Sequence, residues 1–291
     1  MTAQLTDDQI KTILQGIAIP PQPQILVDLQ MEQLDPNCSV LSVAKLISQD
    51  VGLSGSILKT VNSSFFQHAS NITSITQAVN LLGIKTVVNL VNAHSIKGEL
   101  ADEDIIALGR FWDSAMEVAA TSVVIAKQIS MQNPDEAYTL GLFHNCGIPL
   151  LMKRCDDYQS VIQQCYAEQT LSITEKENEL IRTNHAVVGY YVGKAWNLPK
   201  YLCEAIHDHH NPINIFTDEF ADNRKKNLLA VLKMAEFICG CHATIGGQSE
   251  NYEWHQVKQY VLDYVGMTEY DFENLHATVI ELGLGSTDYY S

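Results

Sequence analysis

Apolar residues recur along this chain at spacings of three and four positions, and sustained alternation of apolar and polar residues is scarce. One such stripe consists of Val40, Val43, Ala44 and Ile47. Spacings of three and four place side chains on one face of an α-helix, whereas a strand requires alternation. A further helix should begin after the capping residue Ser74 and end at Gly83. The sequence therefore predicts an all-α fold.

An acidic, polar stretch over residues 97–104 interrupts this pattern. A long helical pattern follows over residues 105–130, so we predict a domain boundary between the two, with one helical domain over residues 1–104 and a second over residues 105–291. Further helices are predicted near residues 135–145, 156–168, 174–183, 185–197, 199–208, 227–241, 252–264 and 268–282.

The charge balance excludes two classes of partner. The chain has 34 acidic and 18 basic residues and a formal net charge of −16. Nucleic acids and anionic membranes are bound by neutralising phosphates with Lys and Arg, so we expect neither as a partner. No run of 18 apolar residues occurs, and the first ten residues carry acids where a secretory signal would carry bases. We therefore expect no membrane span and a cytoplasmic location.

Several histidines fall at the ends of predicted helices. His144 and Asn145 follow one helix, His185 opens the next amphipathic one, and His209 and His210 close another. Neutral imidazoles and carboxylates together hold Fe, Mn or Zn, which makes a metal site one interpretation. A structural role is the other, because a histidine at a helix end can donate to a backbone carbonyl.

Glu236 lies within a predicted helix among apolar neighbours. A buried carboxylate needs a partner, and a histidine would be one.

Ordered blocks of sequence resemble the HDOD family. In the N-terminal part they are residues 19–23 (IPPQP), 47–53 (ISQDVGL), 61–66 (VNSSFF) and 72–83 (ITSITQAVNLLG). In the C-terminal part they are Phe111-Trp112, residues 142–147 (LFHNCG), 184–189 (NHAVVG), 196–199 (WNLP) and 205–210 (AIHDHH). The resemblance spans about residues 15–245, and it implies a multi-helix HD-like bundle with an N-terminal helical HDOD subdomain.

The wider HD superfamily includes phosphohydrolases. The resemblance implies that those enzymes use a first His, an adjacent His-Asp pair and a later Asp around one or two metal ions, which generate hydroxide and neutralise phosphoryl oxygens. In this chain the first position corresponds to Ser114, or to Asp113 if the register shifts by one, the pair to His144-Asn145, and the later Asp to Glu236. A neutral amide bridges two cations poorly and a hydroxyl is a weak ligand, so Ser114 and Asn145 are degenerate positions.

Five residues still match positions that bind metal in better-equipped relatives, namely His144, His185, His209, His210 and Glu236. From the weakened set we expect a bacterial-type signal-transduction module that acts through a signalling protein partner in trans, without catalytic residues, bound cofactor or cofactor-binding residues. One alternative is an HD-type metal-dependent phosphohydrolase that keeps Fe, Mn, Mg or Zn on those five residues. Another is a sensor whose old cleft binds a nucleotide or another small molecule.

Overall fold

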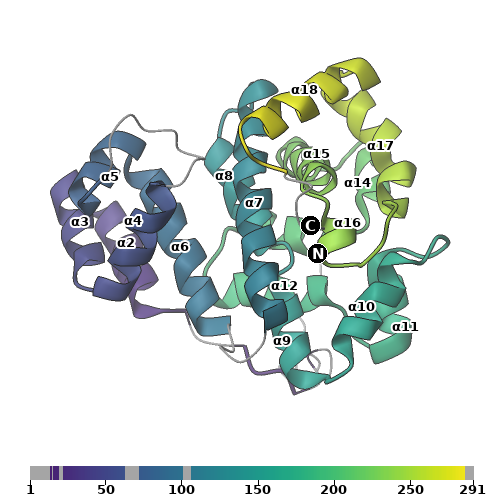
Figure 1. The fold of residues 1–291 in the computed structure, drawn as a ribbon, viewed down its shortest axis with the longest axis horizontal. Helices are drawn as coiled ribbons and strands as arrows, with labels where there is room; N and C mark the ends of the chain where they lie inside the picture. Colours follow the sequence, from purple (N-terminus) through teal and green to yellow (C-terminus); the bar gives the residue numbers. More distant parts are fainter. Residues whose placement is uncertain (1–13, 15, 20–21, 63–71, 101–105, 286–291) are drawn as a thin grey trace.

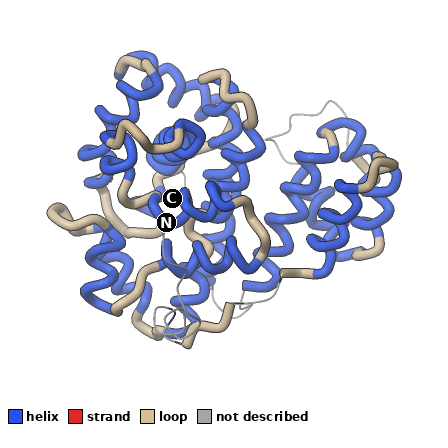
Figure 2. Tube along the Cα trace, turned by 180° about the vertical axis from the view of Figure 1, so that it is seen from behind, coloured by secondary structure: helices blue, strands red, loops and turns tan. Residues whose placement is uncertain are grey.

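The computed structural model describes residue 14 and residues 16–19, 22–62, 72–100 and 106–285. All regular elements in these residues are helices, and no strand occurs among them (Figure 2). The predicted all-α class is therefore confirmed. In chain order the helices are α2 (Gln24–Leu34), α3 (Val40–Ser48), α4 (Val51–Val61), α5 (Ile75–Leu82), α6 (Ile84–Leu100), α7 (Ile106–Gln128), α8 (Pro134–Phe143), α9 (Gly147–Arg154), α10 (Tyr158–Tyr166), α11 (Ile173–Ile181), α12 (His185–Ala195), α13 (Lys200–Asp208), α14 (Pro212–Thr217), α15 (Asn223–Ile238), α16 (Cys241–Thr244), α17 (Tyr252–Val265) and α18 (Glu269–Glu281).

Helices α2 to α5 form a group of their own beside α6 (Figure 1). The predicted stripe on α3 is turned inward, since Val43, Ala44 and Ile47 are buried. The expected bounds of α5 are also confirmed, because the Ser74 side chain accepts a hydrogen bond from Gln77 N and the backbone turns at Gly83 with φ of 84°. Local capping signals therefore fix the ends of these helices.

Helices α7 to α18 form the larger group, with α15 at its centre (Figure 1). Helix α15 packs against α7, α8, α13 and α17, and buries an almost unbroken run of residues from Leu228 to Glu236. Helix α6 also contacts α8, so the smaller group adjoins the larger one. Residues 101–105 lie outside the described residues, and the predicted domain boundary after residue 104 stays a prediction.

The helix predicted over residues 135–145 ends earlier in the structure, and a second helix follows it. Helix α8 ends at Phe143, and α9, which was not predicted, begins at Gly147. A Cβ atom at Gly147 would lie 2.1 Å from the backbone oxygen of His185, so the start of α9 crosses the start of α12 in backbone contact. This close crossing brings the segment that carries His144 and Asn145 beside His185.

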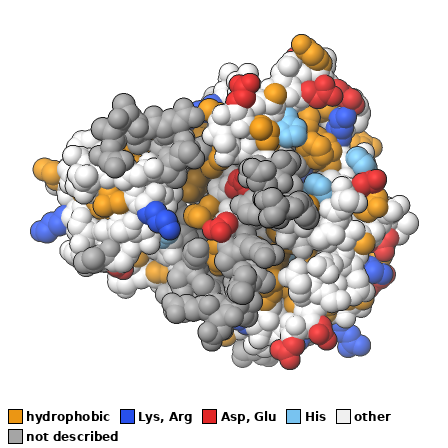
Figure 3. Space-filling model, in the orientation of Figure 1, with side chains coloured by type: hydrophobic (Ala, Val, Ile, Leu, Met, Phe, Trp, Pro, Cys, Tyr) orange, Lys and Arg blue, Asp and Glu red, His pale blue; other side chains and the backbone are white. Residues whose placement is uncertain are grey.

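Two findings bear on partners and location. Within the described helices, none combines the length and the apolar character needed to cross a membrane. On the face drawn in Figure 3, Lys and Arg side chains are scattered and do not gather into a basic patch.

All seven cysteines are free thiols.

Candidate functional site

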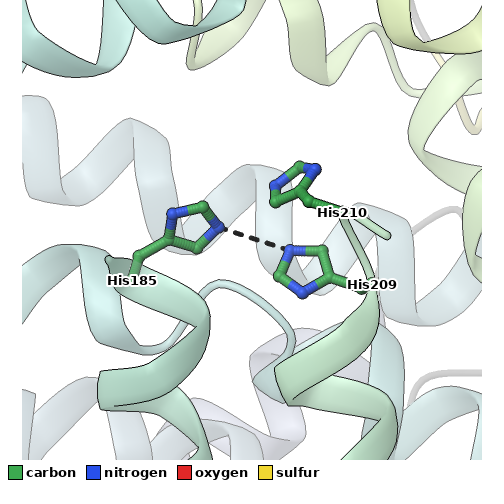
Figure 4. A group of neighbouring side chains, drawn as sticks. All are labelled: His185, His209 and His210. Carbon is green, nitrogen blue, oxygen red and sulfur yellow. Dashed lines mark hydrogen bonds between the residues drawn. The ribbon is translucent and has the colours of Figure 1, made fainter. Parts of the chain in front are cut away.

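Four of the histidines predicted from the sequence meet in the interior of the larger group. His144, His185, His209 and His210 are each no more than 3% exposed. The potential ligand nitrogens of His185, His209 and His210 all lie within 4.8 Å of one another (Figure 4). The ring of His144 completes the cluster, with its centroid 5.4 Å from that of His209. We call these four residues the histidine cluster.

Helix ends position each of these imidazoles. The Asn184 side chain caps α12 by accepting a hydrogen bond from Val187 N, which sets His185 at the first position of the helix. His144 and His209 are the residues that follow α8 and α13, and each bends back on its own helix. His144 Nδ1 donates to Gly141 O, and His209 Nδ1 donates to Ile206 O, both at 2.7 Å. The backbone hydrogen bond expected for His144 is present, and it is compatible with both a structural and a metal-binding role.

Carboxylates orient the other two rings. His185 Nδ1 donates to Glu177 Oε2 at 2.7 Å, and His210 Nδ1 donates to Glu253 Oε1 at 2.7 Å. Neither glutamate was singled out from the sequence. With Nδ1 engaged as a donor, the Nε2 atom of a neutral imidazole carries the free lone pair. All four histidines therefore share the arrangement in which an outer partner fixes the ring and leaves Nε2 for a guest.

Three histidines of the cluster are held neutral. Burial lowers the pKa of His144 to about 3, and burial together with nearby positive charge lowers the pKa values of His209 and His210 well below the ordinary range. Nε2 of His185 lies 3.3 Å from Nε2 of His209, while Nε2 of His144 and of His210 has no hydrogen-bond partner in the described structure. Buried lone pairs that converge without partners suit water or a cation.

Glu236 reaches the cluster from α15, and its Oε1 lies 3.5 Å from His144 Nε2. Its main partner is a residue that sequence reasoning missed. Lys233, one turn earlier and 2% exposed, places Nζ 2.8 Å from Glu236 Oε2 and 3.0 Å from Glu253 Oε2. The prediction that a buried Glu236 would need a partner is confirmed, although a lysine provides the closer contact.

The ammonium of Lys233 is charged despite its burial. Burial lowers its pKa, but the carboxylates of Glu236 and Glu253 outweigh that effect and raise it above the ordinary value. Burial also raises the pKa of Glu236 to about 7, and Lys233 opposes this rise. The site therefore contains a fixed positive charge of its own.

The two degenerate positions are buried, and one of them, Asn145, follows His144 directly in the chain. Asn145 is 1% exposed, and neither its Oδ1 nor its Nδ2 has a hydrogen-bond partner among the described residues. Ser114, 3% exposed, lies with its Oγ 3.9 Å from Cys241 Sγ. An amide with two unsatisfied polar atoms in the interior is unusual and indicates space for water or a ligand.

The donor set suits one divalent ion better than two. Nitrogen donors from His185, His209 and His210 are close enough to share an ion, and Glu236 and His144 lie beside them. A bridging carboxylate helps to hold a metal pair. At the position where the HDOD resemblance implies such a carboxylate, this chain has the neutral amide of Asn145, and Glu236 is already ion-paired.

A cavity of about 230 Å³ lies beside His210 and Glu253. The link between α10 and α11, helix α14 and the first turn of α17 surround it, and the described residues of its lining include no Lys or Arg. Two further glutamates, Glu168 and Glu175, line it. This cavity therefore offers an uncharged or cationic molecule a better environment than a phosphate.

Comparison with solved structures defines the class of protein. The fold is shared with an HDOD domain protein of unknown function from Geobacter sulfurreducens, with a TM-score of 0.71 and 21% identity over 94% of each chain. It is also shared with a protein from Marinobacter aquaeolei VT8 that is provisionally named a signal transduction protein, with a TM-score of 0.67 and 19% identity over 97% of this chain and 59% of that one. The chain thus shares the helical fold of these proteins.

The family follows from the sequence match. The model of the HDOD domain matches residues 19–212, and the chain belongs to the HDOD family. It is also 27% identical over 197 residues to an uncharacterized protein of Treponema pallidum (strain Nichols), in a match that covers 66% of this chain and 38% of that protein. The chain therefore spans much less than two thirds of this relative's length.

Proposed function

We propose that this chain is a regulatory HDOD module without hydrolytic activity, and that it acts through contacts with a signalling protein in trans. The observation that carries the proposal is the state of the histidine cluster. In the described structure, the carboxylate that faces the cluster directly is that of Glu236, and it is ion-paired to Lys233. The position at which a bridging carboxylate is expected is occupied by Asn145. Hydrolysis by a metal pair depends on both anions.

The surface of the smaller helical group supports a role in protein contacts. Large apolar side chains are exposed there on α3 and on two helices that pack against it, namely Met31 and Leu34 on α2, Leu41 on α3 and Leu81 on α5. Exposed apolar side chains mark a surface that binds proteins where they form a contiguous patch. The name of the Marinobacter aquaeolei relative is in keeping with a signalling role.

The test is metal content and phosphodiesterase activity of the chain purified without chelator. We expect at most one Fe, Mn or Zn ion per chain and no turnover of bis-p-nitrophenyl phosphate or a cyclic dinucleotide. Two ions per chain together with turnover would show that the protein is a metal-dependent hydrolase and would contradict the proposal.

A metal-dependent phosphohydrolase is the second candidate, favoured by the four clustered imidazoles whose Nδ1 atoms are all engaged in hydrogen bonds. In that case His144, His185, His209, His210 and Glu236 would hold the ion, which would supply an activated water. Replacing both His144 and His185 by Ala should then abolish metal binding and activity while the helical circular-dichroism signal persists. Activity that survives this double substitution would exclude these residues.

A ligand sensor is the third candidate, and the 230 Å³ cavity favours it. Because its lining lacks Lys and Arg, we expect an uncharged ligand and not a nucleotide phosphate. A ligand at 100 times its dissociation constant stabilises the folded state by about 2.7 kcal/mol. A thermal-shift series that pairs nucleosides with their 5′-monophosphates would separate the two cases, and stabilisation by the monophosphates alone would contradict the expected preference.

A further inference from the structure

We infer that the ammonium of Lys233 is the resident cation of the histidine cluster and that it keeps the affinity of the site for divalent ions low. This inference deepens the proposed function and rests on it, because it gives a physical reason for a metal-poor site. Nothing in the sequence motifs of the chain assigns a role to Lys233.

The contacts of Lys233 reach two of the four histidines through carboxylates. Glu236, 2.8 Å from Nζ, lies 3.5 Å from His144 Nε2. Glu253, 3.0 Å from Nζ, accepts a hydrogen bond from His210 Nδ1. One ammonium therefore binds both carboxylates that border this side of the cluster, and it occupies the negative charge that would otherwise attract a metal ion.

Helix geometry makes this pairing a fixed part of the fold. Lys233 and Glu236 are three residues apart on α15, a separation that places two side chains on the same helix face. Lys233 lies in a part of α15 that is buried on all sides, and only 2% of it is exposed. Its side chain cannot turn out to solvent without leaving both carboxylates without their counter-charge.

A divalent ion and the ammonium would compete for the same anion. The ion would need Glu236, and its charge would lie close to that of Lys233 in a region of low dielectric constant, where like charges repel strongly. Displacing Lys233 from the carboxylates would not avoid an energetic cost, because an unpaired charge would then remain buried. The neutral imidazoles alone cannot offset this repulsion, and metal affinity is reduced.

The same helix provides a matched control. Lys226 is also buried, at 7% exposure, but its Nζ donates to the backbone oxygen of Asp218 at 2.7 Å. We would compare Lys233→Met with Lys226→Met, so that each variant loses one buried lysine of α15 and only one of them alters the charge of the cluster.

The experiment is calorimetric titration with Zn²⁺ and Mn²⁺ at pH 8, with thermal unfolding measured in the presence and absence of each ion. We expect Lys233→Met to bind Zn²⁺ at least tenfold more tightly than the natural chain and to regain in Zn²⁺ the thermal stability that it loses without the ion. Lys226→Met should match the natural chain in Zn²⁺ affinity. Equal affinities in all three proteins would overturn the inference.

A second variant guards against misfolding. Lys233→Gln keeps a hydrogen-bond donor for the two carboxylates and removes only the charge, so it should show the same gain in Zn²⁺ affinity if Lys233→Met does not fold. The outcomes separate the two proposals. If the Lys233 variants bind Zn²⁺ no more tightly than the natural chain and the natural chain shows no turnover, only the role of Lys233 is overturned. Turnover by the natural chain overturns the proposed function.

Discussion

The carboxylate of Glu177 holds His185 at two points: Oε1 accepts a hydrogen bond from the backbone nitrogen at 2.9 Å, and Oε2 accepts one from Nδ1 at 2.7 Å. Tyr158 donates a further hydrogen bond to Oε1 at 2.6 Å. Glu177 and His185 are both fully buried. The orientation of this imidazole is therefore determined by α10 and α11, and not by anything bound in the cluster.

Replacing Glu177 by Gln should cost about 2–4 kcal/mol of unfolding free energy, because an amide can accept only on one side and leaves at least one buried donor unsatisfied. Urea unfolding would measure the loss. Glu179→Gln on the same helix is the control, since its ion pair with Lys176 is at the surface and should be dispensable. Equal stability of the two variants would contradict the role given to Glu177.

Replacing Gly147 by Ala should destabilise the protein by about 3 kcal/mol or more, or prevent folding, because the new methyl group would overlap the backbone oxygen of His185 and backbone cannot yield as a side chain can. Gly55→Ala is the opposite case. Gly55 is an exposed residue of α4 with open space at its Cβ position, so alanine should add about 0.5–1 kcal/mol. Thermal and urea unfolding of both variants would show whether the signs differ as expected.

Acid should destabilise the fold. Burial lowers the pKa values of His144, His209 and His210 below the ordinary value of 6.5, so the unfolded chain takes up three protons below that pH that the folded chain does not. Glu236, with its pKa raised to about 7, binds one proton in the folded state that the unfolded carboxyl, at 4.5, does not yet bind. Three less one leaves two protons, and stability should fall between pH 6.5 and 5 by roughly 2–3 kcal/mol per pH unit.

Urea unfolding at pH 8, 6.5 and 5.5 would test this slope. The His144→Gln variant lacks one of the three groups, so its stability should depend on pH by about one proton less. Stability that stays constant or rises as the pH falls would show that these imidazoles can be protonated in the folded protein.

Restoring the missing carboxylate should change metal stoichiometry only when Lys233 is also replaced. We expect the double variant Asn145→Asp, Lys233→Met to bind two Mn²⁺ ions per chain, because it combines a bridging anion with a released Glu236. Asn145→Asp alone should bind no more than one ion. Native mass spectrometry would count the ions, and two ions on the single variant would show that Lys233 does not limit occupancy.

Much of the site could be predicted from the sequence, and the reason lies in helix ends. His144, His185, His209, His210 and Glu236 were all expected in one site, and the structure brings them together. Glu177 and Glu253 could not be found in this way, because they belong to α11 and α17 and approach the cluster only through tertiary packing. Lys233 carried a local signal, three residues before Glu236, but its burial depends on the helices around α15.

Helix α9 was not predicted, although Pro149 in its first turn is compatible with a helix start. Proline is tolerated in the first turn of a helix, where its missing N–H would have had no intrahelical acceptor, and Pro149 lies there in α9. Helix α14 begins with Pro212 in the same way. Neither of these two helices was predicted, although proline in the first turn is compatible with a helix start.

The crossing of α9 and α12 at Gly147 has a consequence for how this chain could carry information. Because the two backbones touch, the segments that carry His144 and His185 are held together unless one helix moves relative to the other. The ligand atoms are already arranged before a guest binds, so binding does not incur the entropy loss of ordering them. Release of the guest would leave the fold unchanged. Binding or release of a guest would therefore affect the rest of the protein by redistributing charge and solvent, and not by folding or unfolding a segment.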